Sequence, residues 1–370
     1  MFYFSIDQHR RQLTISLRDE KGKVVLRQQV STQWERVREF FAQLRERCAA
    51  DGGFVAILEV CGFNDWLLKM LAEYGCQEIV LVQPETRSKK KTDRRDANRL
   101  SELLWVNRQR LRAGEKVQGL RRVWIASAEV REDRQLAELR KRLAAQRTRV
   151  INHVSHILRK HNLQQDCPTK GIKTKAARGW LKNLALPDLD RFEMDHALEQ
   201  WELLDRQLAQ TEKRIGLRVE QNADAQRIAS IYGSAGYSGL ALAASIGSID
   251  RFPRARSLAN YWGITPSCRN SGEATDRLGS ITKQGSATAR FLLGQMVTQV
   301  LRRDAWMRQW YKRIKRRRGS KIARVAVMRR LATIIWQMLK YKQPYLPGDP
   351  AKWKKTSAAA RGGRTGTRAA

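Results

Sequence analysis

The spacing of apolar residues changes along the chain and predicts a mixed α/β region followed by a helical one. Residues 2–7, 12–17 and 24–30 form three short β-rich segments, and the second alternates apolar and polar positions. A continuous apolar run at 54–58 and a further segment at 78–82, apolar from Ile79 onward, follow later in the chain. Such runs are typical of strands that are buried on both faces of a sheet.

Apolar residues spaced three or four apart predict helices before, between and after these two segments. The pattern covers residues 34–48, 66–71 and about 92–106. The resulting order is β-β-β-α-β-α-β-α. This is the order of an RNase H-like fold, in which three antiparallel strands precede parallel βα units. We therefore predict an RNase H-like (RuvC-like) domain over residues 1–118.

From residue 119 the pattern is helical over much longer distances. It extends over residues 123–163 and 190–221, with a shorter helix at 176–184 between them. Two long helices joined by a loop predict an antiparallel coiled-coil hairpin, which we place at residues 119–222.

The last part of the chain divides into a mostly helical domain, 223–345, and a tail, 346–370. Within the domain, apolar spacing predicts helices at 287–302 and 325–341, and a dense basic run lies at 313–318. The tail is rich in lysine, glycine, alanine and arginine, so we expect it to be a disordered basic segment.

Charge then limits the possible partners. The chain has 72 lysine and arginine residues against 36 acidic ones, a formal net charge of +36. Such a protein is expected to bind a polyanion, first of all nucleic acid. The cations are spread over the whole chain, no apolar run approaches the roughly 20 residues that span a bilayer, and no signal peptide is evident, so we expect no membrane partner. Five widely spaced cysteines without a Cys-x-x-Cys pair fit a reducing cytoplasm and argue against a zinc module.

One basic stretch contains two carboxylates at helical spacing. In the segment Lys91-Thr92-Asp93-Arg94-Arg95-Asp96-Ala97, the two aspartates are three residues apart and would share a helix face. They could hold a divalent metal. They could equally belong to a solvated helix whose acids offset the local positive charge, and the stretch alone leaves both interpretations open.

Two further acids favour the metal. Asp7 ends the first predicted strand and Glu59 ends the fourth, and these strands are neighbours in the predicted sheet. Each acid alone could be a turn or strand-end residue. Together, Asp7, Glu59, Asp93 and Asp96 would converge as oxygen ligands of the kind that Mg²⁺ prefers in phosphoryl transfer.

Several motifs in order resemble one family over nearly the whole chain. The family is the DEDD-type transposases of the insertion-sequence one-ten class, which includes Piv-type DNA invertases and bridge-RNA-guided recombinases. Two segments depart from its pattern: Val60-Cys61-Gly62 stands where Ala-Thr-Gly is usual, and Tyr232-Gly233-Ser234-Ala235-Gly236 where relatives commonly carry Pro-Gly-Ile-Gly. The matching motifs are Ile6-Asp7, Glu59 with Gly62, Lys91-Thr92-Asp93-x-x-Asp96-Ala97, Asp250-Arg251-Phe252, Gly263-Ile264-Thr265-Pro266, Ser271-Gly272, Ile281-Thr282-Lys283-x-Gly285, Arg290 and Ala326-x-x-Arg329-Arg330-Leu331.

The resemblance implies an activity and its parts. It implies a site-specific recombinase of an insertion sequence, with Mg²⁺ held by the four acids and Ser271 as the nucleophile that forms a phosphoserine intermediate. It implies a C-terminal transposase domain, a non-coding bridge RNA that guides donor and target double-stranded DNA, and a dimer that assembles into a tetramer. It also implies a prokaryotic cytoplasm, at the nucleoid.

Two other functions stay open from the residues themselves. The chain could be a RuvC-like nuclease or Holliday-junction resolvase in which metal-activated water attacks and Ser271 is structural, or a non-catalytic coiled-coil nucleic-acid-binding protein.

Several cations are expected to contact nucleic acid. They are Lys89, Lys90, Lys91, Arg94, Arg95, Arg269, Lys283, Arg290, Arg316, Arg317 and Arg318.

Overall fold

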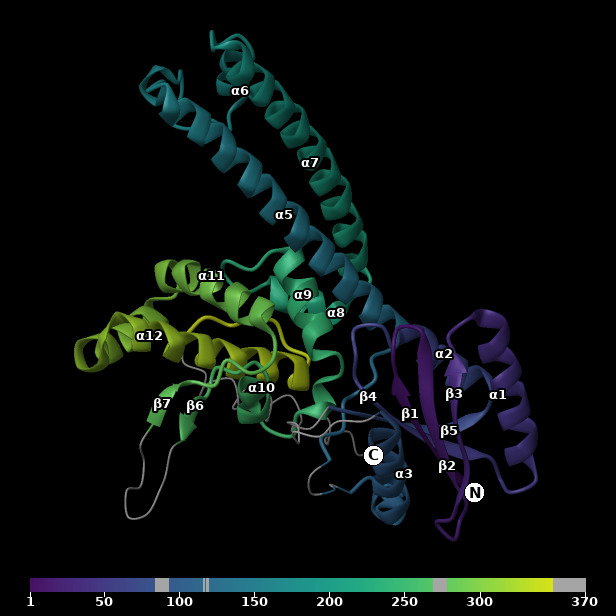
Figure 1. Ribbon diagram of the computed structural model, residues 1–370. Coiled ribbons are helices and arrows are strands. Elements are labelled where there is room, and N and C mark those ends of the chain that lie inside the picture. The colour runs from purple at the N-terminus through teal and green to yellow at the C-terminus, as the bar shows by residue number, and fades with distance from the viewer. Residues whose placement is uncertain (84–92, 116, 118–119, 269–277, 349–370) are drawn as a thin grey trace, which may run out of the picture. The chain divides into compact units, whose positions relative to one another are not determined.

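The computed structural model describes residues 1–83, 93–115, 117, 120–268 and 278–348 (Figure 1). The chain forms two compact units, Met1–Ile125 and Ala126–Ala370. The hairpin and the C-terminal helices therefore belong to one unit. Within the described residues, no helix has the length and apolarity that crossing a membrane would need.

A five-stranded sheet forms the centre of the first unit, with strand order β3-β2-β1-β4-β5. β1 pairs antiparallel with β2 and parallel with β4, and β5 is parallel to β4. The predicted mixed α/β architecture is confirmed, whereas its RNase H-like identity stays a prediction. The strands are β1 (Phe2–Gln8), β2 (Gln12–Arg18), β3 (Val24–Ser31), β4 (Phe54–Glu59) and β5 (Cys76–Val82).

Side chains alternate between the two faces of this sheet, and each face has its own helices. Phe4 and Ile6 lie in the apolar cluster formed with α1 (Trp34–Ala49) and α2 (Asp65–Glu73). Tyr3 and Ile57 lie in the cluster formed with α3 (Asp93–Val106), and α4 (Arg108–Arg112) follows. Burying one such side chain contributes about 1.5–3 kcal/mol.

Two helices of 33 residues, α5 (Ala128–Lys160) and α7 (Asp188–Glu220), pack against each other in the second unit. The 3-10 turn η1 (Gln164–Asp166) and α6 (Lys175–Lys182) connect them. The ion pairs between them join residues of rising number in α5 to residues of falling number in α7, so the two helices are antiparallel. Whether they form a true coiled coil stays a prediction. The pairs are Asp133–Arg218 at 2.7 Å, Arg140–Glu212 at 2.8 Å, Arg147–Asp205 at 3.1 Å and Lys160–Asp190 at 2.7 Å.

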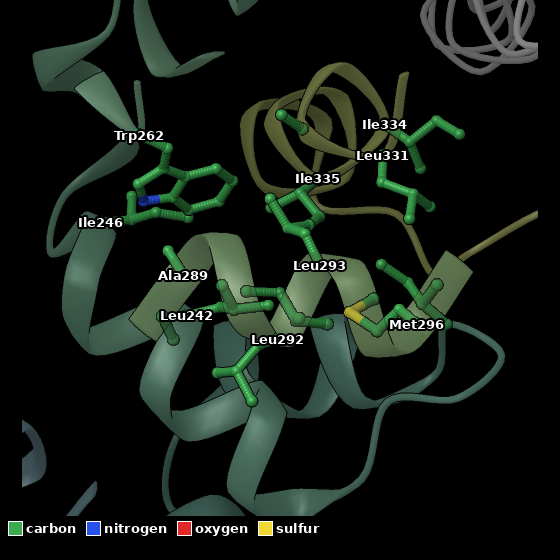
Figure 2. Close-up of a cluster of buried hydrophobic side chains, with 14 of the residues drawn as sticks. Leu242, Ile246, Trp262, Ala289, Leu292, Leu293, Met296, Leu331, Ile334 and Ile335 are labelled. Carbon is green, nitrogen blue, oxygen red and sulfur yellow. The ribbon is translucent and has the colours of Figure 1, made fainter. Parts of the chain in front are cut away.

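The rest of the second unit is mostly helical, as predicted, around one apolar core (Figure 2). Trp262 belongs to that core and is fully buried, and its indole N–H donates to Ser245 Oγ at 3.0 Å. The elements are α8 (Ala223–Ala229), α9 (Gly236–Ile246), η2 (Ile249–Arg251), α10 (Ala255–Tyr261), β6 (Pro266–Cys268), β7 (Leu278–Ile281), α11 (Ala287–Arg303) and α12 (Ala305–Tyr341).

α12 differs from the prediction, which began this helix at residue 325. Helical structure starts at Ala305 and is interrupted at Gly319, with φ 81° and ψ 167°. The Arg330 guanidinium lies 4.9 Å from the ring centre of Trp306 and 4.7 Å from that of Trp310. In a straight helix those residues would be roughly 30 Å apart or more. The two halves of α12 therefore fold back on each other as a helical hairpin.

Candidate functional site

Asp7 and Glu59 are neighbours at one edge of the sheet. Ile6 of β1 lies opposite Leu58 of β4 in parallel register, and each acid is the next residue of its strand. Asp7 is 15% and Glu59 28% exposed at the side chain. The sequence predicted that these strand ends would meet, and the pairing of β1 with β4 brings them together.

Both acids lie on the face of the sheet that α3 covers. Strand alternation places Asp7 on the side of Ser5, whose hydroxyl donates to the carbonyl of Ala97 at 2.6 Å. Glu59 is on the side of Ile57, which packs with the apolar residues of α3. Asp96 precedes Ala97 in the first turn of α3 and is half-buried. The backbone thus gathers three of the four predicted acids at one end of one sheet face.

Each strand-end acid has a cationic or titratable neighbour that the sequence analysis did not identify. His9 Nε2 lies 3.1 Å from Asp7 Oδ2, and Arg99 Nη2 lies 3.8 Å from Glu59 Oε1. Arg99 is three residues after Asp96 on α3, so helical spacing could have indicated it. The arginine offsets the charge of Glu59 within the site.

The described acids have the right donor chemistry for a hard divalent cation but do not complete a ligand set. Carboxylate oxygens are the donors that Mg²⁺ prefers. Among the side chains that the structure describes, no group of three or more His, Cys, Asp or Glu is arranged to hold a metal ion. The fourth predicted acid, Asp93, begins α3, but its side chain lies outside the described part of the chain, as do those of Arg94 and Arg95. Lys89, Lys90 and Lys91 also lie outside it.

Asn64 connects the loop after β4 to the end of β1, a role that no pattern in the sequence indicates. Its side-chain amide donates to Gln8 Oε1 at 2.8 Å and to the carbonyl of Glu59 at 3.2 Å, while its Oδ1 accepts from the Cys61 amide. Asn64 is 5% exposed, so these bonds are shielded from water. They fix the backbone beside both acids. Burial raises the pKa of the neighbouring Cys61 thiol, and the negative charge of Asp7 also raises it. This cysteine therefore stays protonated at neutral pH.

Ser271 belongs to a segment, residues 269–277, that lies outside the described residues, together with Arg269. The structure does describe the two strands that flank it, β6 and β7, which pair antiparallel. Close backbone packing fixes the residues on either side of these two strands, around Gly263 and Gly285, which we call the β6/β7 base. A Cβ at Gly263 would lie 2.1 Å from the Gln284 carbonyl oxygen, and one at Gly285 would lie 2.0 Å from that of Tyr261. Both glycines also have positive φ, at 64° and 74°.

Arg290 of α11 fastens the same base. Its Nη1 donates to the carbonyl oxygens of Trp262 at 3.1 Å, Gln284 at 3.0 Å and Gly285 at 3.3 Å. The structure thus gives Arg290 a positioning contact, and its nucleic-acid contact stays a prediction. Lys283 is exposed, with φ 55°, on the loop that Arg290 holds. The motif residues around 263, 285 and 290 therefore fix the two strands that lead into and out of the Ser271 segment.

Two family models match the chain, and together they cover both units. A DEDD-type model described as "Transposase" matches residues 4–163. A model described as "Transposase IS116/IS110/IS902 family" matches residues 225–312. The first match contains the strands that carry Asp7 and Glu59, and the second contains β6, β7 and the base held by Arg290.

Two similar proteins have transposase names. A probable family 20 transposase of Pseudomonas aeruginosa is 26% identical over 346 residues, covering 89% of this chain and 94% of that protein. The transposase for insertion sequence element IS1111A of Coxiella burnetii is 27% identical over 340 residues, covering 89% of this chain and 87% of that protein. Both alignments thus extend through the two units.

Proposed function

Because the chain belongs to the IS110/IS116/IS902 family of transposases, we propose that it is the site-specific recombinase of an insertion sequence that cuts and rejoins DNA through Ser271. The observation that supports this most is the adjacent placement of Asp7 and Glu59 beside the first turn of α3. Isolated surface acids would not be expected to lie together in a protein of net charge +36.

The acids would serve to hold a divalent metal, which we propose to be Mg²⁺. Asp7 and Glu59 would supply oxygens from the sheet, and Asp93 and Asp96 from α3. A metal so held neutralises a scissile phosphate and stabilises the charge that develops on it. Arg99 offsets the charge of Glu59, and the hydrogen bonds of Asn64 keep both strand ends in place.

Ser271 would be the nucleophile. Its Oγ attacks the phosphorus, the bond from phosphorus to the 3′ oxygen breaks, and the serine proton is transferred so that a free 3′-hydroxyl leaves. The product is a phosphoserine linkage. Attack by another 3′-hydroxyl reverses the reaction and joins a new partner, with no external energy source.

The proposed partners are donor and target double-stranded DNA, a guiding non-coding RNA and further copies of the chain. The high positive charge supports a polyanion partner and does not distinguish DNA from RNA. Sequencing the nucleic acid that co-purifies with the protein tests guidance. A structured RNA with matches to both the element ends and the insertion site is expected.

Trapping a covalent protein–DNA adduct tests the proposed chemistry. The wild-type chain should form an adduct with the DNA of its own element, and Ser271→Ala should not. Ser267→Ala is the matched control, because Ser267 lies on the neighbouring strand β6 and donates to the carbonyl of Ser280. An adduct that persists in Ser271→Ala would contradict the assignment.

A metal-activated water is the second candidate nucleophile, and the acid cluster favours it independently of Ser271. In that case strand cleavage would survive Ser271→Ala without any adduct, but would be lost in Asp96→Asn. The same pair of variants therefore separates the two mechanisms.

A further inference from the structure

The turn between the two halves of α12 carries a dense group of exposed cations. Gly319 makes the turn, and its positive φ of 81° ends the first half. We call the surrounding cations the α12 tip. They are all exposed, and they are Arg313, Lys315, Arg316, Arg317, Arg318 and Lys321.

The hairpin that presents this tip is firmly held at its other end. Arg330 of the second half packs over the rings of Trp306 and Trp310 of the first half. Met307 and Leu331 are fully buried in the core of the second unit. The tip is therefore a projecting end on a rigid support, and contacts made there need little ordering of the backbone.

The charge of the tip is not compensated within the described chain. None of its six cations forms an ion pair with a described residue. The sequence also contains no acidic residue from Ala305 to Gly348. Cations in the last turn of a helix offset the helix dipole by about 0.3–1 kcal/mol, which accounts for one or two of them and not for six. The remainder repel one another in the absence of a polyanion.

The chemistry of the tip indicates which polyanion it takes. No aromatic residue occurs between Lys312 and Arg329, so the tip offers no ring on which an unpaired base could stack. Exposed guanidinium and ammonium groups bind phosphate oxygens without reading the bases. Resting on the proposed function, we propose that the α12 tip binds the phosphate backbone of double-stranded DNA. The tip thereby holds the duplex through its phosphates and without reading its base sequence.

A salt titration of DNA binding tests the proposal. The variant combines Arg316→Gln, Arg317→Gln, Arg318→Gln and Lys321→Gln in the full-length chain. Affinity for a 30-bp duplex is measured by fluorescence anisotropy, with chelator present so that no cleavage occurs. Each lost phosphate contact lowers the slope of log affinity against log salt by about 0.9, so with equal affinity at 1 M salt the loss of two contacts weakens binding roughly 60-fold at 0.1 M.

The matched control removes the same charge from the first unit. It combines Arg36→Gln, Arg38→Gln, Arg45→Gln and Arg47→Gln, four exposed residues of α1. We expect the tip variant to lose slope and affinity and the control to lose much less. An equal loss in both variants, or none in the tip variant, would overturn the proposal. Thermal melts of both variants show that each one is folded.

The outcomes also separate this proposal from the proposed function. Equal duplex binding by the wild type and the tip variant refutes the role of the tip and leaves the proposed function untouched. Protein that forms no adduct with Ser271 intact refutes the recombinase chemistry but not the tip. A 30-nucleotide single-stranded RNA is titrated in parallel. If the tip variant loses RNA affinity and keeps duplex affinity, the duplex assignment is wrong.

Discussion

Two charged regions of the molecule use electrostatics in opposite ways. At the sheet edge, Asp7 and Glu59 are mostly buried, and His9 and Arg99 lie beside them. At the α12 tip, six cations are exposed and no described acid pairs with them. A partly buried group interacts strongly and at fixed geometry, while exposed charges act additively and are screened by salt. Substitutions at the sheet edge should therefore abolish DNA cleavage, whereas substitutions at the tip should weaken DNA binding in proportion to the charge removed.

The largest effect is expected at the sheet edge. Glu59→Gln or Asp96→Asn should lower the rate of DNA strand cleavage by about 10³-fold or more, because losing a metal ligand removes several kcal/mol of transition-state stabilisation. The assay is cleavage of the element's own DNA end. Glu46→Gln, an exposed acid of α1, is the control and should cleave normally. Normal cleavage by Glu59→Gln would remove the distinction between edge and surface acids.

The apolar core next to the β6/β7 base held by Arg290 should be the next most sensitive place. Trp262→Ala removes a fully buried ring together with its hydrogen bond to Ser245, at a cost of about 3–5 kcal/mol in the free energy of unfolding. Urea unfolding measures the change. The four-site tip variant should unfold at nearly the wild-type urea concentration. A tip variant as unstable as Trp262→Ala would show that the tip charges are structural.

Asn64→Ala should have an intermediate effect. It removes a buried amide, leaves Gln8 at the end of β1 without that partner, and should cost about 1–3 kcal/mol in unfolding free energy. Cleavage should fall further than stability alone explains, because the loop beside both acids is released. Strand cleavage is measured well below the melting temperature. Full activity there would limit Asn64 to a structural role.

The smallest effect is expected from pH on the α5/α7 hairpin. Hydrogen bonds from Lys160 and His161 lower the pKa of Asp190. Burial alone would raise the pKa of Asp205, but hydrogen bonds from Arg178 and Arg147 outweigh it and lower that pKa. Folded values below the unfolded ones mean that this stability is present above about pH 4 and is lost as pH falls through the depressed values.

Circular dichroism melts between pH 7 and pH 3 follow this loss of stability. Asp190→Asn should be less stable than wild type at pH 7 and should show a smaller fall in melting temperature toward pH 3. An unchanged fall in Asp190→Asn would show that other carboxylates control acid unfolding.

Short-range sequence patterns predicted most strands and helices, because these elements depend mainly on residues close together in the chain. The apolar run at 54–58 and the segment 78–82, apolar from Ile79, predicted the parallel strands β4 and β5, and the acids at the strand ends followed from that order. Helix bounds were off by a few residues, as for α5, predicted from 123 and observed from Ala128. Helix ends depend on caps and tertiary contacts that periodicity does not contain.

Contacts between distant residues were not predictable in the same way. The hairpin in α12 depends on Arg330 packing over Trp306, 24 residues earlier, and in the sequence this stretch is only a basic run. The three carbonyl contacts of Arg290 and the network of Asn64 also require knowing which loops meet. The roles of Ser271 and Mg²⁺ came from family resemblance and stay predictions.

Binding of Mn²⁺, a paramagnetic stand-in for Mg²⁺, tests most directly whether the acids hold a metal. Electron paramagnetic resonance of the full chain reports free and bound Mn²⁺ during a titration. We predict saturable binding to the wild-type chain and to Glu46→Gln, and its loss in the double variant Asp7→Asn with Glu59→Gln. Unchanged Mn²⁺ binding in the double variant would show that Asp7 and Glu59 do not hold a metal.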